Sequence, residues 1–167
     1  FLDVLKGLLP TLFAGRIINT QMAVESAEVA GEMLAGTGTS KGQMVWLCVA
    51  TACIIGHMFP IYLKFKGGKG VATSLGVILG IWPYFTLTGV VVFLMWTAIW
   101  TWTRTVSIAS IVAAAAFPIY LAILTWRMPG WEFAEMKPLF VFSTLLAILV
   151  IVKHKSNIGR LVNGTEK

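Results

Sequence analysis

A loop rich in glycine and lysine lies between two apolar segments, in the run Leu63-Lys64-Phe65-Lys66-Gly67-Gly68-Lys69-Gly70-Val71. Consecutive glycines let several backbone N–H groups point into one concavity, and the lysines surround it with positive charge. A helix that begins at Val71 would add the positive end of its dipole. The pattern predicts a phosphate-binding loop whose binding residues are Lys66, Gly67, Gly68, Lys69 and Gly70.

This loop is not a nucleotide P-loop. The G-x-x-x-x-G-K-[ST] template requires glycine at Leu63 and Ser or Thr at Gly70, so ATP is not the expected ligand. The alternative interpretation is a positively charged cytoplasmic turn that follows membrane topology rules and binds nothing.

Two further pairs of polar residues lie at predicted helix ends. Asp3 and Lys6 are three residues apart and share a helix face. They form a simple ion pair at the helix end, or Lys6 also reaches toward a phosphate. Arg104 lies at a helix junction. It is interpreted either as a bidentate phosphate ligand or as an anchor at the membrane interface. Ser107 is a phosphate contact or the cap of the next helix.

Two histidines and an asparagine are candidate catalytic residues. His154 and Asn157 are three residues apart, so on a continuing helix they would face the same way and orient a hydroxyl. The alternative is a polar exit from the membrane without chemistry. His57 lies near the end of an apolar segment, where it is a functional residue or a structural one that holds a backbone carbonyl.

The composition is typical of a polytopic membrane protein. Of 167 residues, 57% are hydrophobic and 12% are charged, whereas a soluble domain carries about 25% charge. The net charge of +6 suits loops that meet anionic lipid, and no basic stripe predicts nucleic-acid binding. Cys48 and Cys53 are interpreted as small packed side chains, and no ligand cluster predicts a metal site.

The apolar segments predict an all-α integral membrane protein with six transmembrane or half-membrane helices, at 1–18, 43–56, 70–81, 84–103, 107–126 and 138–153. The second and third are too short for a full span of about 20 residues, so they are expected to be half-helices or strongly tilted. Pro83 divides one long apolar run into two helices. The polar stretch 19–42 predicts a loop, with room for a short surface helix.

Alternate threading of these helices separates the cations into nine on one side and four on the other. The first set is Lys6, Lys64, Lys66, Lys69, Arg104, Lys153, Lys155, Arg160 and Lys167. The second set is Arg16, Lys41, Arg127 and Lys137. By the positive-inside rule, the nine-cation side is cytoplasmic. The unusual polar residues fall on that side, which favours an active site there.

These motifs resemble the bacterial membrane acyl-phosphate:glycerol-3-phosphate acyltransferases over essentially the whole chain. The block from Gly56 to Gly76 is similar to the glycine-rich second motif of that family, and Asp3 to Pro10 resembles the helix after its first motif. Two further parts of the chain resemble the third region and the C-terminal signature of the family. The residues that carry this resemblance are Arg104, Ser107, His154, Asn157, Arg160, Gly164 and Glu166.

In the family, a further N-terminal span and a Ser-Gly-Asn-x-Gly-x-Thr-Asn type motif would precede Phe1, giving seven helices. The resemblance therefore implies a single, N-terminally truncated membrane domain over residues 1–167. We expect such a chain to fold poorly or to be inactive by itself.

The resemblance implies that a fatty acyl group passes from acyl phosphate to the 1-hydroxyl of glycerol 3-phosphate, as the first step of phospholipid synthesis. His154, Asn157 and His57 are then the catalytic candidates, Asp3 and Glu166 are structural, and no cofactor or metal is required. The proton acceptor is His154, His57 or the leaving phosphate. We expect the protein to lie in the bacterial inner membrane as a monomer. Its active site and its C-terminus are expected on the cytoplasmic side.

Two other functions fit parts of the pattern. A membrane transporter or channel for an organic phosphate would also use a half-helix anion site, but no internal repeat is present in the sequence. A non-catalytic membrane scaffold would explain the apolar segments without explaining the clustered Gly, Lys, His and Asn.

Overall fold

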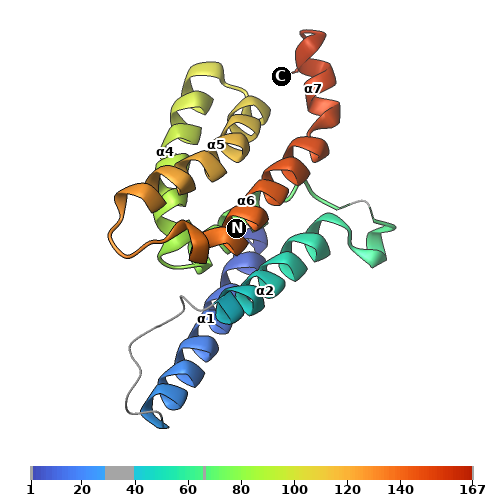
Figure 1. Ribbon diagram of the computed structural model, residues 1–167. Helices are drawn as coiled ribbons and strands as arrows, with labels where there is room; N and C mark the ends of the chain where they lie inside the picture. Colours follow the sequence, from blue (N-terminus) through green and yellow to red (C-terminus); the bar gives the residue numbers. More distant parts are fainter. Residues whose placement is uncertain (1, 29–39, 66, 167) are drawn as a thin grey trace.

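The computed structural model describes residues 2–28, 40–65 and 67–166. All regular structure in these ranges is helical. The elements are α1 (Leu2–Glu28), α2 (Ser40–Met58), the 3-10 turn η1 (Ile61–Leu63), α3 (Val71–Gly80), α4 (Tyr84–Thr103), α5 (Val106–Arg127), α6 (Phe133–Lys153) and α7 (Lys155–Val162). In Figure 1, α4 and α5 pack side by side, and α6 leads into α7 near the carboxyl end.

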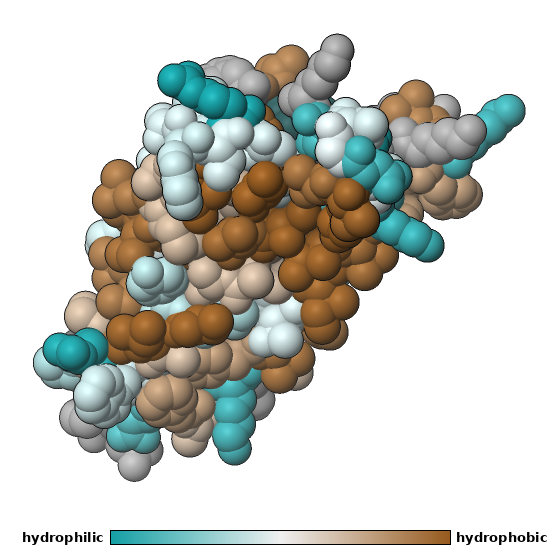
Figure 2. Space-filling model, turned by 90° about the horizontal axis from the view of Figure 1, so that it is seen from above, coloured by the Kyte–Doolittle hydropathy of each residue, from teal (hydrophilic) through white to brown (hydrophobic). Residues whose placement is uncertain are grey.

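Within the described residues, three helices, α4, α5 and α6, are long and apolar enough to cross a membrane. The apolar part of α2, Gly42–Met58, and the ten-residue α3 are shorter, as predicted from the sequence. Figure 2 shows hydrophobic residues as a broad band across one face, with hydrophilic residues toward its two ends. These features confirm the predicted all-α integral membrane architecture.

One local prediction was wrong. Residues 19–28 were predicted as loop, but α1 continues to Glu28. This stretch lacks Gly and Pro, and it contains several strong helix formers. At the other end of the chain, α6 ends at Lys153, as the predicted segment 138–153 does. The backbone turns at His154, where φ is −90° and ψ is 8°, and α7 begins at Lys155, so His154 and Asn157 do not share one unbroken helix. Residues 29–39 lie outside the described part of the chain.

Helices α1 and α3 approach each other at backbone distance. A Cβ atom on Gly7 would overlap the Thr73 carbonyl oxygen, and one on Gly76 would overlap the Val4 carbonyl oxygen. One helical turn after Gly76, a Cβ atom on Gly80 would overlap the Thr11 hydroxyl. Small residues at this spacing allow helices to pack closely in a membrane. The contact fixes α3, and with it the glycine-rich loop, against α1.

We expect Gly76→Ala to separate α1 from α3 and to lower the free energy of unfolding by about 3 kcal/mol, because the new methyl group meets backbone rather than a movable side chain. Thermal unfolding in detergent measures the effect. Gly159→Ala is the matched control, since it is also helical and its Cβ meets no atom within 4 Å. Equal melting temperatures for the two variants would contradict the proposed contact.

Candidate active site

A polar cavity of about 700 Å³ lies where α1, α3 and α5 begin, where α2 ends, and where α6 gives way to α7. Nine of the predicted site residues line it: Asp3, His57, Gly68, Lys69, Gly70, Ser107, His154, Asn157 and Glu166. Residues up to 163 positions apart in sequence therefore meet in one place, as the sequence predicted for the helix ends on one side of the membrane.

The glycine-rich loop folds tightly against the end of α2. A Cβ atom on Gly67 would overlap the His57 carbonyl oxygen, and one on Gly68 would overlap the His57 imidazole. Gly70 has φ of +80° and immediately precedes α3, so the left-handed conformation favours glycine there as well. The loop is thus pressed onto α2 at several points, which brings its backbone and Lys69 to the cavity.

Lys153 at the end of α6 supports the same region. Its ammonium group donates a hydrogen bond of 3.1 Å to the Met58 carbonyl oxygen, one of the unpaired acceptors at the end of α2. The same group lies 3.9 Å from the centroid of the Phe59 ring. Because His154 is the next residue, this contact ties the histidine to the loop.

His57 is held between two elements. Its Nδ1 atom lies 3.5 Å from the Asp3 carboxylate, which also accepts a 2.8 Å hydrogen bond from Lys6. The ring packs against Gly68 on its other side. The structural interpretation expected a contact with a backbone carbonyl, whereas the contact made by Nδ1 is with the Asp3 carboxylate. The ring also lines the cavity.

His154 is almost fully buried, with 2% of its surface exposed. Its Nδ1 atom lies 2.8 Å from the Val150 carbonyl oxygen, which can only accept a hydrogen bond. Nδ1 therefore carries a proton, and in the neutral ring Nε2 has a free lone pair. This arrangement gives the cavity a fixed group that can accept a proton.

Asn157, Ser107 and Glu166 form a compact hydrogen-bonded cluster. The Asn157 amide donates to Ser107 Oγ and to Glu166 Oε1, both at 2.6 Å, and Ser107 Oγ donates to Glu166 Oε1 at 2.5 Å. Arg160 Nε donates to the other Glu166 oxygen at 2.6 Å. The cluster leaves Asn157 Oδ1 buried and without a hydrogen-bond partner among the described residues. That oxygen is the acceptor in this cluster that the described residues leave unpaired.

The same contacts show which groups Ser107 and Glu166 touch. Ser107 does not cap α5 through its side chain; its hydroxyl contacts the tail instead. Hydrogen bonds from Ser107 and Asn157, followed by Arg160, lower the pKa of Glu166 to about 2. Glu166 is therefore ionised at neutral pH, and it holds the tail over the start of α5.

Not every predicted phosphate ligand lines the cavity. Lys6 is exposed and pairs with Asp3 at the rim of the cavity. Gly67 packs against the end of α2 instead of lining the cavity. Arg104 is exposed at the end of α4, in a left-handed conformation with φ of 56°, and is not among the lining residues. Lys66 lies outside the described residues.

Comparison with known proteins places the chain in a family. The family model described as glycerol-3-phosphate acyltransferase matches residues 1–164. The chain belongs to the glycerol-3-phosphate acyltransferase family.

The glycerol-3-phosphate acyltransferase of Trichlorobacter lovleyi is 37% identical over 164 residues, which are 98% of this chain and 67% of that protein. The corresponding protein of Geobacter sulfurreducens is 39% identical over 165 residues, again 98% and 67% of the two chains. The chain thus spans about two thirds of the length of these relatives.

Two solved structures have the same fold. Both are crystal structures of PlsY (YgiH), an integral membrane glycerol 3-phosphate acyltransferase, one in its glycerol 3-phosphate form and one in its lysophosphatidic acid form. Each aligns with all of this chain at 32% identity with a TM-score of 0.71, and the alignments cover 67% and 68% of the respective PlsY chains.

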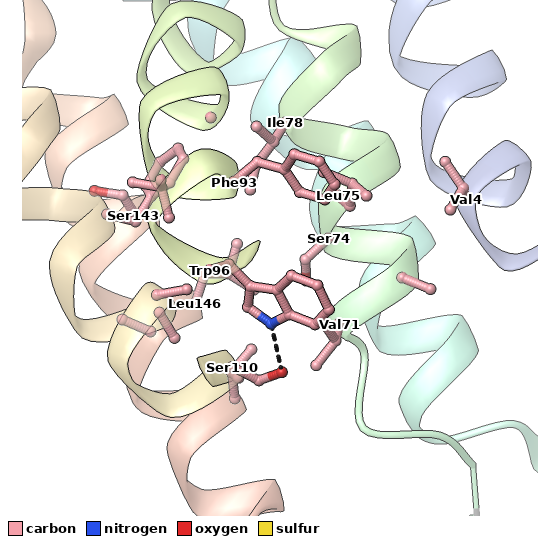
Figure 3. Close-up of a pocket in the computed structure, with 18 residues that line it drawn as sticks. Val4, Val71, Ser74, Leu75, Ile78, Phe93, Trp96, Ser110, Ser143 and Leu146 are labelled. Carbon is pink, nitrogen blue, oxygen red and sulfur yellow. Dashed lines mark hydrogen bonds between the residues drawn. The ribbon is translucent and has the colours of Figure 1, made fainter. Parts of the chain in front are cut away.

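This acyltransferase has a second, apolar cavity of about 360 Å³ beside the first. Leu75 and Ile78 of α3 and Phe93 and Trp96 of α4 line it, and α1, α5 and α6 contribute the remaining wall (Figure 3). Phe93 is 44% exposed, so the cavity opens to the surface that faces lipid. Val71, Ala72 and Ser110 line both cavities, which therefore adjoin each other at the start of α3.

Sequence reasoning named Arg160 only as part of the C-terminal signature, without a role in the site, and did not name Ser110, although both line the polar cavity. Their spacing carried a signal. Arg160 follows Asn157 by three residues, as Asn157 follows His154, and Ser110 follows Ser107 by three. On a helix, residues three apart share a face. Thr165 and Val106 also line the cavity and had no recognisable signal in the sequence.

The charge on Glu166 predicts a pH dependence of stability. A carboxylate with a lowered pKa stabilises the folded state above its unfolded pKa near 4.5, and this contribution is lost as the pH falls toward about 2. We expect the melting-temperature difference between the natural protein and Glu166→Gln to be constant from pH 8 to pH 5 and to shrink between pH 4.5 and pH 2. A difference that persists undiminished at pH 2 would contradict the role of the charge.

Proposed function

We propose that this protein transfers a fatty acyl group from an acyl phosphate to the 1-hydroxyl of glycerol 3-phosphate, giving lysophosphatidic acid and inorganic phosphate. The observation that carries the proposal is the junction of the two cavities at Val71, Ala72 and Ser110. An acyl phosphate has one apolar end and one dianionic end. The apolar cavity fits the first, and the polar cavity, with its cations and loop N–H groups, fits the second.

The chemistry requires mainly positioning and charge neutralisation. An acyl phosphate is an activated mixed anhydride, so no covalent protein nucleophile is required. Two anionic phosphates must lie close together, and Lys69 and the glycine-rich loop offset their repulsion. Arg160 adds a second cation beside the cavity, partly engaged by Glu166.

We assign the attacking hydroxyl to the neighbourhood of His154 and Asn157. Asn157 Oδ1, without a partner among the described residues, accepts the hydroxyl hydrogen bond, and His154 Nε2 is the favoured proton acceptor. His57 is less suited, because its ring is held between Asp3 and Gly68. The leaving phosphate remains the other acceptor.

The proposed location is the cytoplasmic membrane of a bacterium, with the polar cavity on the cytoplasmic side. The support is the positive-inside rule, which assigns the nine-cation side to the cytoplasm, and the polar cavity lies among those helix ends. We further propose that residues 1–167 are part of a single membrane domain and that the enzyme acts as a monomer.

The donor is tested with the full-length protein purified in detergent, labelled glycerol 3-phosphate, and either acyl phosphate or acyl-CoA of the same chain length. We expect lysophosphatidic acid from acyl phosphate alone, with one phosphate released for each product formed. Faster product formation from acyl-CoA would contradict the proposed donor. If the folded protein forms no product from either donor, the acyltransferase function is contradicted. Turnover by protein in detergent, without vesicles, would exclude transport as the measured activity.

The loop is tested by Lys69→Ala against Lys64→Ala. Lys69 lines the cavity, whereas Lys64 is exposed outside it, and the two changes remove the same charge. We expect Lys69→Ala to lower kcat/KM for glycerol 3-phosphate by about 10- to 100-fold, which corresponds to losing one hydrogen bond to a charged group, at about 1.5–3 kcal/mol. Lys64→Ala should stay within about twofold of the natural protein. Equal losses in both variants would indicate a general effect of surface charge.

A further inference from the structure

The junction of the two cavities contains a hydroxyl group that the proposed reaction does not yet use. Ser110 lines both cavities and is only 3% exposed. Its oxygen accepts a 3.1 Å hydrogen bond from the Trp96 indole N–H, shown as the dashed line in Figure 3. No acceptor for the Ser110 hydroxyl hydrogen is present among the described residues. The indole therefore fixes the oxygen and leaves its O–H free to donate.

Backbone donors lie at the same place. Val71 and Ala72 form the first turn of α3, whose N–H groups have no acceptor within the helix. The first hydrogen bond of this helix runs from the Ser74 N–H to the Gly70 carbonyl, at 2.7 Å. Ser74 is 6% exposed, lines the apolar cavity, and its hydroxyl has no partner among the described residues.

The bound substrate must place one particular group at this junction. In an acyl phosphate, the carbonyl carbon joins the hydrocarbon chain to the phosphate. If the chain occupies the apolar cavity and the phosphate occupies the polar one, the carbonyl lies where the two meet. Donors aimed at a carbonyl oxygen there stabilise the negative charge that develops when the carbon is attacked.

We propose that Ser110, held by Trp96, is a further catalytic residue that donates a hydrogen bond to the carbonyl oxygen of the acyl phosphate. This inference rests on the proposed function. The attacking hydroxyl oxygen forms a bond to the carbonyl carbon, and its proton passes to His154 or to the phosphate. The carbonyl oxygen becomes an oxyanion held by Ser110 and the first turn of α3. Collapse re-forms the carbonyl and breaks the bond to the phosphate oxygen, which leaves with the electron pair.

The test compares variants of the full-length enzyme in the acyl phosphate assay. We expect Ser110→Ala to lower kcat about 100-fold, as removal of one oxyanion donor does, with KM for both substrates within about twofold. Ser110→Thr, which keeps the hydroxyl, should recover most of the loss. Trp96→Phe, which removes the indole donor, should lower kcat about fivefold, because the Ser110 hydroxyl is then less well oriented.

Thr125→Val is the matched control. Thr125 lies on the same helix, is 2% exposed, and donates only to the Leu121 carbonyl oxygen, away from both cavities. It should leave kcat unchanged. If the natural enzyme is active and Ser110→Ala retains kcat within threefold, the role of Ser110 is wrong while the proposed function stands. A Ser110→Ala variant that loses activity through a raised KM and a lowered melting temperature would also overturn it. A natural enzyme without activity would instead refute the proposed function.

Discussion

The backbone contact between α1 and α3 is the constraint on which the site depends. Gly7, Gly76 and Gly80 allow the two helices to touch without intervening side chains. The start of α3 then lies beside Asp3, and the side chains farther along α3 form one wall of the apolar cavity. One short helix thus contributes to both cavities. A shift of α3 would move the phosphate-binding loop and the wall of the apolar cavity together.

The second requirement is to keep buried polar groups paired around a cavity that must accept anions. Glu166 is the one carboxylate inside the cluster near α7, and hydrogen bonds from Ser107, Asn157 and Arg160 satisfy its oxygens. The cluster neutralises its negative charge locally and leaves Lys69 to face the cavity. A partly buried carboxylate is tolerated when it is paired in this way. The structural cluster and the reactive groups can therefore share a small volume.

The sequence predicted the features that local pattern determines. Apolar runs and Pro83 predicted α4, α5 and α6, and the Gly and Lys residues predicted the loop at 66–70, because these signals act over a few residues. The Ser107 contact with Glu166 joins residues 59 apart, and nothing local reveals it. The pairing of Trp96 with Ser110 equally requires α4 and α5 to be packed together. Long-range packing, rather than residue type, decided which polar groups entered the site.

The central claim is that a single acyl phosphate spans both cavities, with its carbonyl at the start of α3. The most direct measurement is a structure of the full-length enzyme with a non-hydrolysable acyl phosphonate. The account predicts the phosphonate beside Lys69, the carbonyl oxygen within hydrogen-bond distance of Ser110, and the chain between α3 and α4. A phosphonate in the polar cavity whose chain leaves along another pair of helices, with Ser110 still bonded only to Trp96, would contradict it.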